Sequence, residues 1–314
     1  MQTSCKATPE KLSFLHQLEG RSSSFIRAVF KMVLKSTWIF FLIFCSCRGY
    51  GLNTRMGCSR NIMSMSLQGK TGFLFDRDQN TYLTAILRKS VDSCTLCIEE
   101  GSKLIELEFP ANRKNDLSLG ETLDTNRQFT RQFVEAFASY GMDLWILFPD
   151  KKECFLAREK WGEDLPFTMT SIEGLLEKNP PSIPQLMVIV NPGFSVDEWI
   201  NIPKLDRGVP MIIINGNLDR LRNGYYPWFI YPALTKVTKE FYSKAVQAVF
   251  LSPIAVGGSR LGAWLTRIYP GQWEVLVKGT TEYDVVSVSD KEPEAKIAWQ
   301  TAKKNYLERT GQMF

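Results

Sequence analysis

Histidine, the side chain that most often moves protons near neutral pH, occurs once in the 314 residues, as His16. A Ser-His-Asp triad, a Cys-His dyad and a His-ligated zinc site all need a histidine in the folded body of a protein. His16 lies in a segment that we expect to be removed, so these three kinds of site are excluded from the body. The sequence therefore assigns no catalytic residue and predicts neither a metal nor a cofactor.

Polar residues that follow predicted strands are the main candidates for a binding site. In a doubly wound sheet, ligands bind beyond the carboxyl ends of the parallel strands, so these side chains could converge on one rim. They would form a pocket for a small anionic or hydroxylated ligand. The alternative is that they form Asx turns and helix caps, which loops between strands and helices need in any case. Arg267, further along the chain, could also hold an anion. The full set of candidate residues is Asp150, Asn191, Asn215, Asp219, Arg220 and Arg267.

Two further motifs carry weaker signals. The segment 257–262 is rich in glycine but lacks the G-x-G-x-x-G spacing, and no P-loop motif occurs, so a flexible hairpin is favoured over a phosphate site. Cys94 and Cys97 form a C-x-x-C pair, and Cys154 is the only other cysteine after residue 75. Three cysteines make neither a disulfide framework nor a complete zinc site, so ordinary helix cysteines are favoured over a redox pair.

Glu106 and Glu108 flank Leu107 in the first predicted strand and would point to the same side of it. Burying two unpaired carboxylates would cost several kcal/mol. We therefore expect this strand to lie at an exposed edge or at the end of a sheet.

The candidate residues are positioned by short, continuously apolar runs, which are typical of strands covered on both faces. Helical patterns alternate with these runs, as in βαβ units. After residue 260, three strands follow too closely for crossover helices, at 261–269, 273–278 and 283–289. The predicted fold is α/β: a largely parallel, doubly wound sheet with helices on both faces and a C-terminal antiparallel meander. The six predicted parallel strands are 104–109, 144–148, 167–172, 186–190, 209–214 and 248–251.

Amphipathic stripes and capping signals place the helices. Phe129, Phe133, Phe137 and Tyr140 form one stripe, with Gly141 as its stop signal. Other helices are expected at 82–100, around 234–241 and at 294–309. Three pairs fit capping boxes at helix starts, namely Thr125 with Gln128, Thr170 with Glu173, and Ser195 with Glu198.

The first 75 residues have the character of a targeting leader. Residues 1–19 have no net charge, and eight Lys or Arg residues and no acid lie between Glu19 and Asp76. Because the whole chain has a net charge of +5, residues 76–314 have a net charge of −3. Because the basic charge belongs to the leader, nucleic-acid binding by the body is not expected. The apolar run 38–45 fits a signal-peptide core, and the acid-free stretch 52–67 resembles a transit peptide. A two-part leader of this kind predicts import into a plastid; the alternative is one uncleaved anchor helix.

Ordered short motifs give the body, residues 76–314, a family resemblance over roughly residues 80–300. It resembles the plastid domain-of-unknown-function family that includes the low-photosystem-II-accumulation-3 protein and the tail of a chloroplast adenylate kinase. One departure is Asn215-Gly216, where the family usually has Asn-Pro. The motifs are Ile105-Glu-Leu-Glu-Phe-Pro110, Glu121-Thr-Leu-Asp124-Thr-Asn-Arg127, Leu147-Phe-Pro-Asp150, Ala157-Arg158, Trp161, Val190-Asn-Pro192, Ile214-Asn215 and Arg267-Ile-Tyr-Pro-Gly271-Gln-Trp273.

The resemblance implies a location in the plastid stroma, a role near photosynthetic-complex biogenesis and no established catalytic residues. We therefore expect a single-domain, non-catalytic binding or assembly factor without a stable membrane span in its mature form. Its partner would be a protein, such as a thylakoid complex or one of its assembly factors. The alternative is an enzyme or sensor that binds a nucleotide or sugar phosphate at the carboxyl ends of the parallel strands.

Overall fold

In a computed structural model, the described residues are 78–112, 117–139, 141–162, 164–256, 259–279 and 282–310. The predicted leader, Tyr140 and the pair Gly257-Gly258 lie outside them, as does the side chain of Arg260. Within these ranges, no helix has both the length and the apolar character needed to cross a membrane.

One nine-stranded sheet organises this part of the chain, in the order β3-β2-β4-β5-β1-β6-β7-β8-β9. Strands β1 to β6 run parallel, and β7, β8 and β9 continue the sheet antiparallel. This confirms the predicted fold class, and β2 and β4 have the predicted bounds. The parallel strands are β1 (Leu104–Glu108), β2 (Leu144–Phe148), β3 (Thr168–Ser171), β4 (Leu186–Val190), β5 (Met211–Ile214) and β6 (Val246–Val256).

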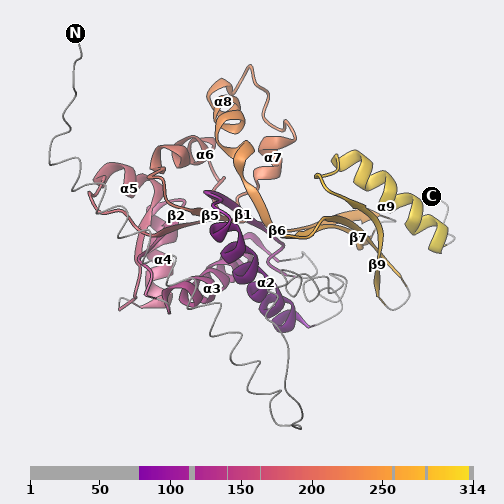
Figure 1. Ribbon diagram of the computed structural model, residues 1–314, viewed down its shortest axis with the longest axis horizontal. Helices are drawn as coiled ribbons and strands as arrows, with labels where there is room; N and C mark the ends of the chain where they lie inside the picture. Colours follow the sequence, from indigo (N-terminus) through magenta and orange to yellow (C-terminus); the bar gives the residue numbers. More distant parts are fainter. Residues whose placement is uncertain are drawn as a thin grey trace, which may run out of the picture. The chain divides into compact units, whose positions relative to one another are not determined.

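Helices cover both faces of the parallel strands, as predicted (Figure 1). On one face lie α2 (Gln79–Glu99), α3 (Leu119–Ala138) and α4 (Lys151–Trp161). On the other, buried side chains such as Leu175, Trp199 and Leu234 pack into one core with the strands. The elements on that second face are α5 (Ile172–Lys178), α6 (Val196–Asn201), η2 (Ile202–Leu205), α7 (Leu218–Arg222), α8 (Pro232–Glu240) and η3 (Tyr242–Lys244).

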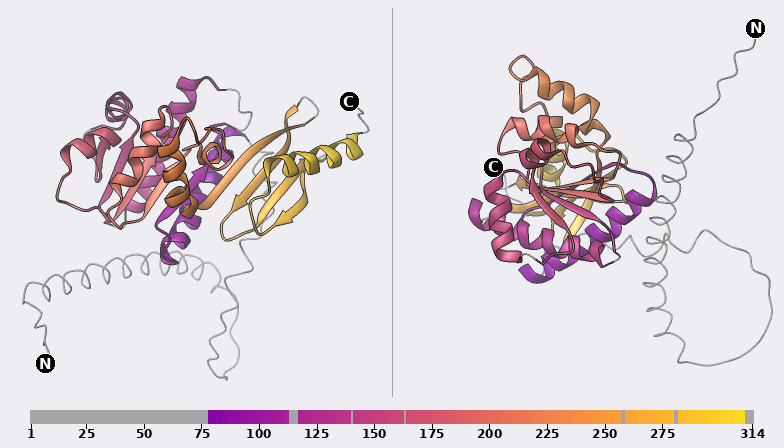
Figure 2. Two further views of the ribbon diagram at one scale, coloured as in Figure 1. Left: turned by 90° about the horizontal axis from the view of Figure 1, so that it is seen from above. Right: turned by 90° about the vertical axis from the view of Figure 1, so that its left-hand side faces the viewer.

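The C-terminal meander has a core of its own. It consists of β7 (Ser259–Ile268), β8 (Trp273–Lys278) and β9 (Tyr283–Ser289), and α9 (Ala295–Thr310) lies across one side of it (Figure 2). Ala298 and Ala302 of α9 pack against Trp273 and neighbouring strand residues. Strand β6 joins the two halves, because it pairs in parallel with β1 and antiparallel with β7.

Two of the three predicted capping boxes are wrong. Helix α3 begins earlier than predicted, at a capping box formed by Ser118 and Glu121, and Thr125 lies inside the helix. Helix α5 is capped by Ser171, whose hydroxyl accepts from the Gly174 N–H. The Ser195–Glu198 box at α6 is confirmed. The two errors have the same cause, since a second hydroxyl residue near each helix start satisfies the same short pattern.

Candidate ligand-binding site

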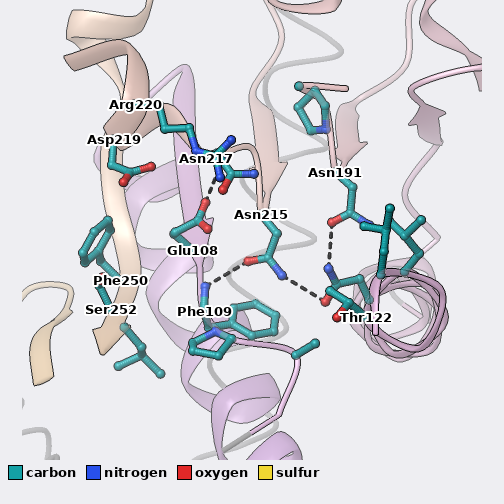
Figure 3. A pocket seen from close by; sticks show the side chains of 18 of the residues that line it. Glu108, Phe109, Thr122, Asn191, Asn215, Asn217, Asp219, Arg220, Phe250 and Ser252 are labelled. Atoms are coloured by element: carbon teal, nitrogen blue, oxygen red, sulfur yellow. Dashed lines mark hydrogen bonds between the residues drawn. The ribbon is translucent and has the colours of Figure 1, made fainter. Parts of the chain in front are cut away.

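A cavity of about 630 Å³ opens at the carboxyl ends of β1, β4 and β5, beside the middle of β6 (Figure 3). The helix that follows β1, α3, and the helix that follows β5, α7, lie on opposite faces of the sheet (Figure 1). Because β1 and β5 are neighbours, the chain leaves a crevice between their ends, which is where doubly wound folds bind ligands. The cavity therefore has the position that the fold class predicts for a site.

Three buried asparagine side chains hold the floor of the cavity together (Figure 3). Asn126 of α3 donates from Nδ2 to Oδ1 of Asn191, at 2.8 Å, and its own Oδ1 accepts from Nδ2 of Asn215, at 3.0 Å. Oδ1 of Asn215 accepts from the Phe109 N–H at 2.9 Å. These bonds tie the ends of β4, β5 and β1 to α3, so much of the amide capacity of Asn191 and Asn215 serves the protein's own structure.

Two glycines allow the backbone to approach closely beside this floor. A Cβ on Gly193, which has a φ of +115°, would lie 2.4 Å from the Trp199 ring. A Cβ on Gly216 would lie 2.5 Å from Cγ2 of Ile213. Trp199 Nε1 donates to the Gly216 carbonyl at 3.0 Å, so the indole fixes both loops that carry these glycines. The cavity wall is consequently a packed and hydrogen-bonded structure.

Glu106 and Glu108 do not lie at an edge, so that expectation is wrong. Strand β1 lies in the middle of the sheet, between β5 and β6, and the Glu106 side chain has no exposed surface. Its carboxylate is paired with Arg222, whose Nη1 and Nη2 lie 2.7 and 3.1 Å from the two oxygens. The high cost of burial applies to unpaired carboxylates, whereas Glu106 is paired with a cation that stands 116 residues later in the chain.

Glu108 lines the cavity, and its environment disfavours ionisation. Burial, with the negative charges of Glu106 and Asp219, raises the pKa of Glu108 to about 8, although the Asn217 N–H and Arg222 oppose the rise. The Asn217 N–H donates to Oε2 of Glu108 at 3.0 Å. Near neutral pH a carboxyl group with this pKa is largely protonated, so Glu108 offers the cavity both a hydrogen-bond donor and an acceptor.

The structure brings four of the six candidate residues together. Asn191, Asn215, Asp219 and Arg220 all line the cavity. Asp150 instead caps α4, where Oδ1 accepts from the Glu153 N–H at 2.8 Å. Arg267 lies on β7, where its guanidinium is 5.4 Å from the Tyr269 ring centroid and 5.7 Å from that of Trp273.

Sequence reasoning missed part of the lining. Glu108, Thr122, Asn126 and Asn217 all face the cavity. A signal existed for Glu108 and Asn217, which stand at strand ends beside residues that were singled out. Thr122 and Asn126 lie in the first turns of α3, inside the 121–127 motif of the family resemblance, but the rule that ligands bind at strand ends does not point to helix residues.

The cavity is suited to holding a polar molecule. Its acidic groups are Glu108 and Asp219, and among its described lining residues Arg220 is the one cationic side chain. The described residues contain no group of three or more His, Cys, Asp or Glu side chains that could hold a metal ion. Cys94 and Cys97 lie buried in α2 as free thiols, and burial raises the pKa of Cys97 to about 12.

Comparison with known proteins identifies one family. No curated protein and no solved structure matches the chain. A family model described as a domain of unknown function (DUF1995) matches residues 81–298. The match runs from α2 into α9 and includes the whole sheet and the cavity. The chain therefore belongs to the DUF1995 family.

Proposed function

We propose that this protein is a plastid accessory protein that acts by binding, and that its ligand site is the cavity at the ends of β1 and β5. The observation that carries the ligand site is the convergence of donors and acceptors at a crevice of about 630 Å³. That volume falls within the range of small-molecule sites.

The charges of the lining favour an uncharged, hydroxylated ligand. The lining contains Asp219 and a largely protonated Glu108, and Arg220 is the one cation among its described residues. A phosphate group would bring about two negative charges next to these carboxyl groups. An alcohol or sugar hydroxyl can both donate to Asp219 and accept from the Glu108 carboxyl proton. A nucleotide or sugar phosphate, the alternative class, is therefore less well served by this cavity.

A thermal-shift screen of uncharged polyols and sugars beside their phosphorylated counterparts tests this assignment. A ligand present at 100 times its dissociation constant adds about 2.7 kcal/mol of stability, which shifts the melting temperature measurably. Thr122→Trp should abolish the shift, because Thr122 lines the cavity and an indole would fill the space beside it. Gln128→Trp is the matched control, because Gln128 is an exposed residue of the same helix that does not line the cavity.

Each outcome of the screen decides between the ligand classes. A shift with the uncharged compounds that Thr122→Trp removes supports the assignment. A shift with phosphorylated compounds alone favours the alternative class. A flat screen, or a shift that Thr122→Trp leaves unchanged, contradicts the cavity as the ligand site.

The plastid location and the link to photosynthetic complexes are supported by different observations. They rest on the leader, which is basic and free of acids between Glu19 and Asp76, and on the resemblance described above. Import of the full chain into isolated plastids should yield a shortened stromal form that lacks residues 38–45. Mild crosslinking should then recover a thylakoid complex or an assembly factor with it. A full-length product retained in a membrane, or no partner after crosslinking, would count against this role.

A further inference from the structure

The segment between α7 and α8 exposes an unusual set of large apolar side chains. We name residues 223–231 the aromatic loop. Tyr225, Trp228, Phe229 and Ile230 are between 57% and 71% exposed, whereas large apolar side chains usually gather in the core. No charged residue occurs between Arg222 and Lys236. Contiguous apolar surface of this kind marks a contact with a partner or with a membrane.

The aromatic loop is held in place rather than loosely attached. The N–H groups of Ile230 and Tyr231 donate to the Pro227 carbonyl at 3.1 and 3.0 Å, which closes a tight turn under the exposed side chains. Tyr226 packs edge-on against the buried Trp199, and Tyr231 packs edge-on against Tyr226. Tyr226 and Tyr231 therefore anchor the loop to the core, while Trp228, Phe229 and Ile230 are exposed to solvent.

The shape and charge of this region fit a lipid surface. The aromatic loop projects away from the sheet beyond its flanking helices, as a convex tip (Figures 1 and 2). A convex apolar tip can enter a soft bilayer, whereas a protein partner would need a matching groove. Trp and Tyr are the residues that favour the bilayer interface. Arg220, Lys236 and Lys239 flank the tip, and the acidic residues of the two flanking helices are Asp219 in α7 and Glu240 in α8.

We propose that the aromatic loop is a membrane-docking tip: Trp228, Phe229 and Ile230 enter the interfacial layer of a bilayer with anionic headgroups, and the flanking cations face those headgroups. This contact is peripheral and reversible, because three side chains bury far less apolar surface than a spanning helix does. It does not depend on the proposed cavity ligand. The loop and the cavity are adjacent, since the Arg220 guanidinium lies 5.8 Å from the Tyr225 ring centroid.

Hydroxyl-radical footprinting of the full chain tests the proposal at single residues. The probe is vesicles made of equal parts of phosphatidylcholine and phosphatidylglycerol. Oxidation of Trp228 and Phe229 should fall several-fold on addition of vesicles, and less so with phosphatidylcholine alone or in high salt. Phe155 is the internal control, because it is 58% exposed and lies on α4, on the other face of the sheet. A site-resolved footprint is needed because the apolar run 38–45 is expected to bind vesicles by itself.

Two triple variants provide matched controls, after circular dichroism confirms that both are folded. In W228S/F229S/I230S the protection of Tyr225 should disappear, because the apolar tip is gone. In F155S/I183S/I297S, which removes three side chains of comparable exposure elsewhere, the protection of the loop should remain.

Three results would overturn the proposal. The first is a chain that does not bind the vesicles. The second is a bound chain in which Trp228 and Phe229 are oxidised as fast as in solution. The third is protection that appears without vesicles and grows with protein concentration, which would assign the loop to a contact between two copies of the chain.

Discussion

Replacing Arg222 by methionine should destabilise the protein strongly and in a pH-dependent way. Arg222 makes the paired contact with Glu106 described above, and the side chains are 19% and 0% exposed. Removing one partner of a buried pair costs about 3–5 kcal/mol. The partial exposure of Arg222 places the expected cost near the lower end, at about 3 kcal/mol. That is a large share of the roughly 5–15 kcal/mol that keeps a domain folded.

The pH dependence follows from the direction of the Glu106 pKa. Burial raises the pKa of Glu106 above 4.5, and Arg222 opposes the rise, so the variant should have a still higher folded-state pKa. A carboxyl group whose pKa is higher in the folded state than in the unfolded state stabilises the fold at pH values below the unfolded-state pKa. This stabilisation is lost as the pH rises through the folded-state pKa. The cost of Arg222→Met should therefore be largest in mildly alkaline buffer and should shrink toward about pH 5.

Urea unfolding followed by circular dichroism, at about pH 8 and about pH 5, measures this cost. The double variant E106L/R222M is the control, because replacing both members of a buried pair by apolar residues is often neutral or stabilising. It should recover most of the stability at both pH values. A cost for Arg222→Met below about 1 kcal/mol at the higher pH would refute the reasoning, as would an equal cost at both pH values.

Three further predictions concern the cavity and the helix that borders it. Glu108 has a pKa of about 8 in the folded protein, so the wild type should lose stability relative to Glu108→Gln as the pH rises from about 5 to about 9. Urea unfolding at several pH values measures this difference. If the free energies of unfolding of the two proteins change in parallel with pH, the prediction is contradicted. Asn126→Ala leaves two buried amide groups without a partner and should cost about 2–4 kcal/mol, against less than about 0.5 kcal/mol for Asn80→Ala, which changes an exposed residue; equal costs would show that the network is dispensable. Ser118→Ala should lower the free energy of unfolding by about 1 kcal/mol, because the N-terminal cap of α3 is lost. Thr125→Ala should cost less, and thermal melts compare the two variants. A larger loss of stability in Thr125→Ala than in Ser118→Ala would show that Thr125 is the cap, as the sequence pattern predicts.

Most of the fold could be predicted because its signals are local. The runs Leu144–Phe148 and Leu186–Val190 match strands β2 and β4 residue for residue, and every side chain in them is buried. All five residues of each run are apolar, as is typical of strands covered on both faces, so the run itself marks where the strand begins and ends. Helix starts were less secure, because Ser118 and Thr125 are both followed three residues later by Glu or Gln, and only the backbone conformation distinguishes the cap.

The site was predicted in part because it depends on strand order. Residues at strand ends could be listed from sequence, but which ends are neighbours could not. Asp150 follows β2, which lies beyond β4, and its side chain serves as a helix cap. Glu106 and Glu108 were misplaced because the neutralising contact to Glu106 joins residues 116 positions apart. Composition and spacing show a charge, but the partner that makes its burial tolerable comes from the tertiary fold.

The central position of β1 also governs when the sheet can be completed. Leu104 pairs with Met211 and Ile105 with Val246, so both neighbours of the strand come more than 100 residues after it. In a chain that emerges from a ribosome or an import pore amino end first, this segment stays unpaired until β5 appears, and its second edge stays open until β6 appears. Pairings of such long range slow folding and leave apolar edges open in the interval. We therefore expect a nascent chain that stops short of Val256 to be held by chaperones, and release to coincide with the arrival of the eleven-residue strand β6.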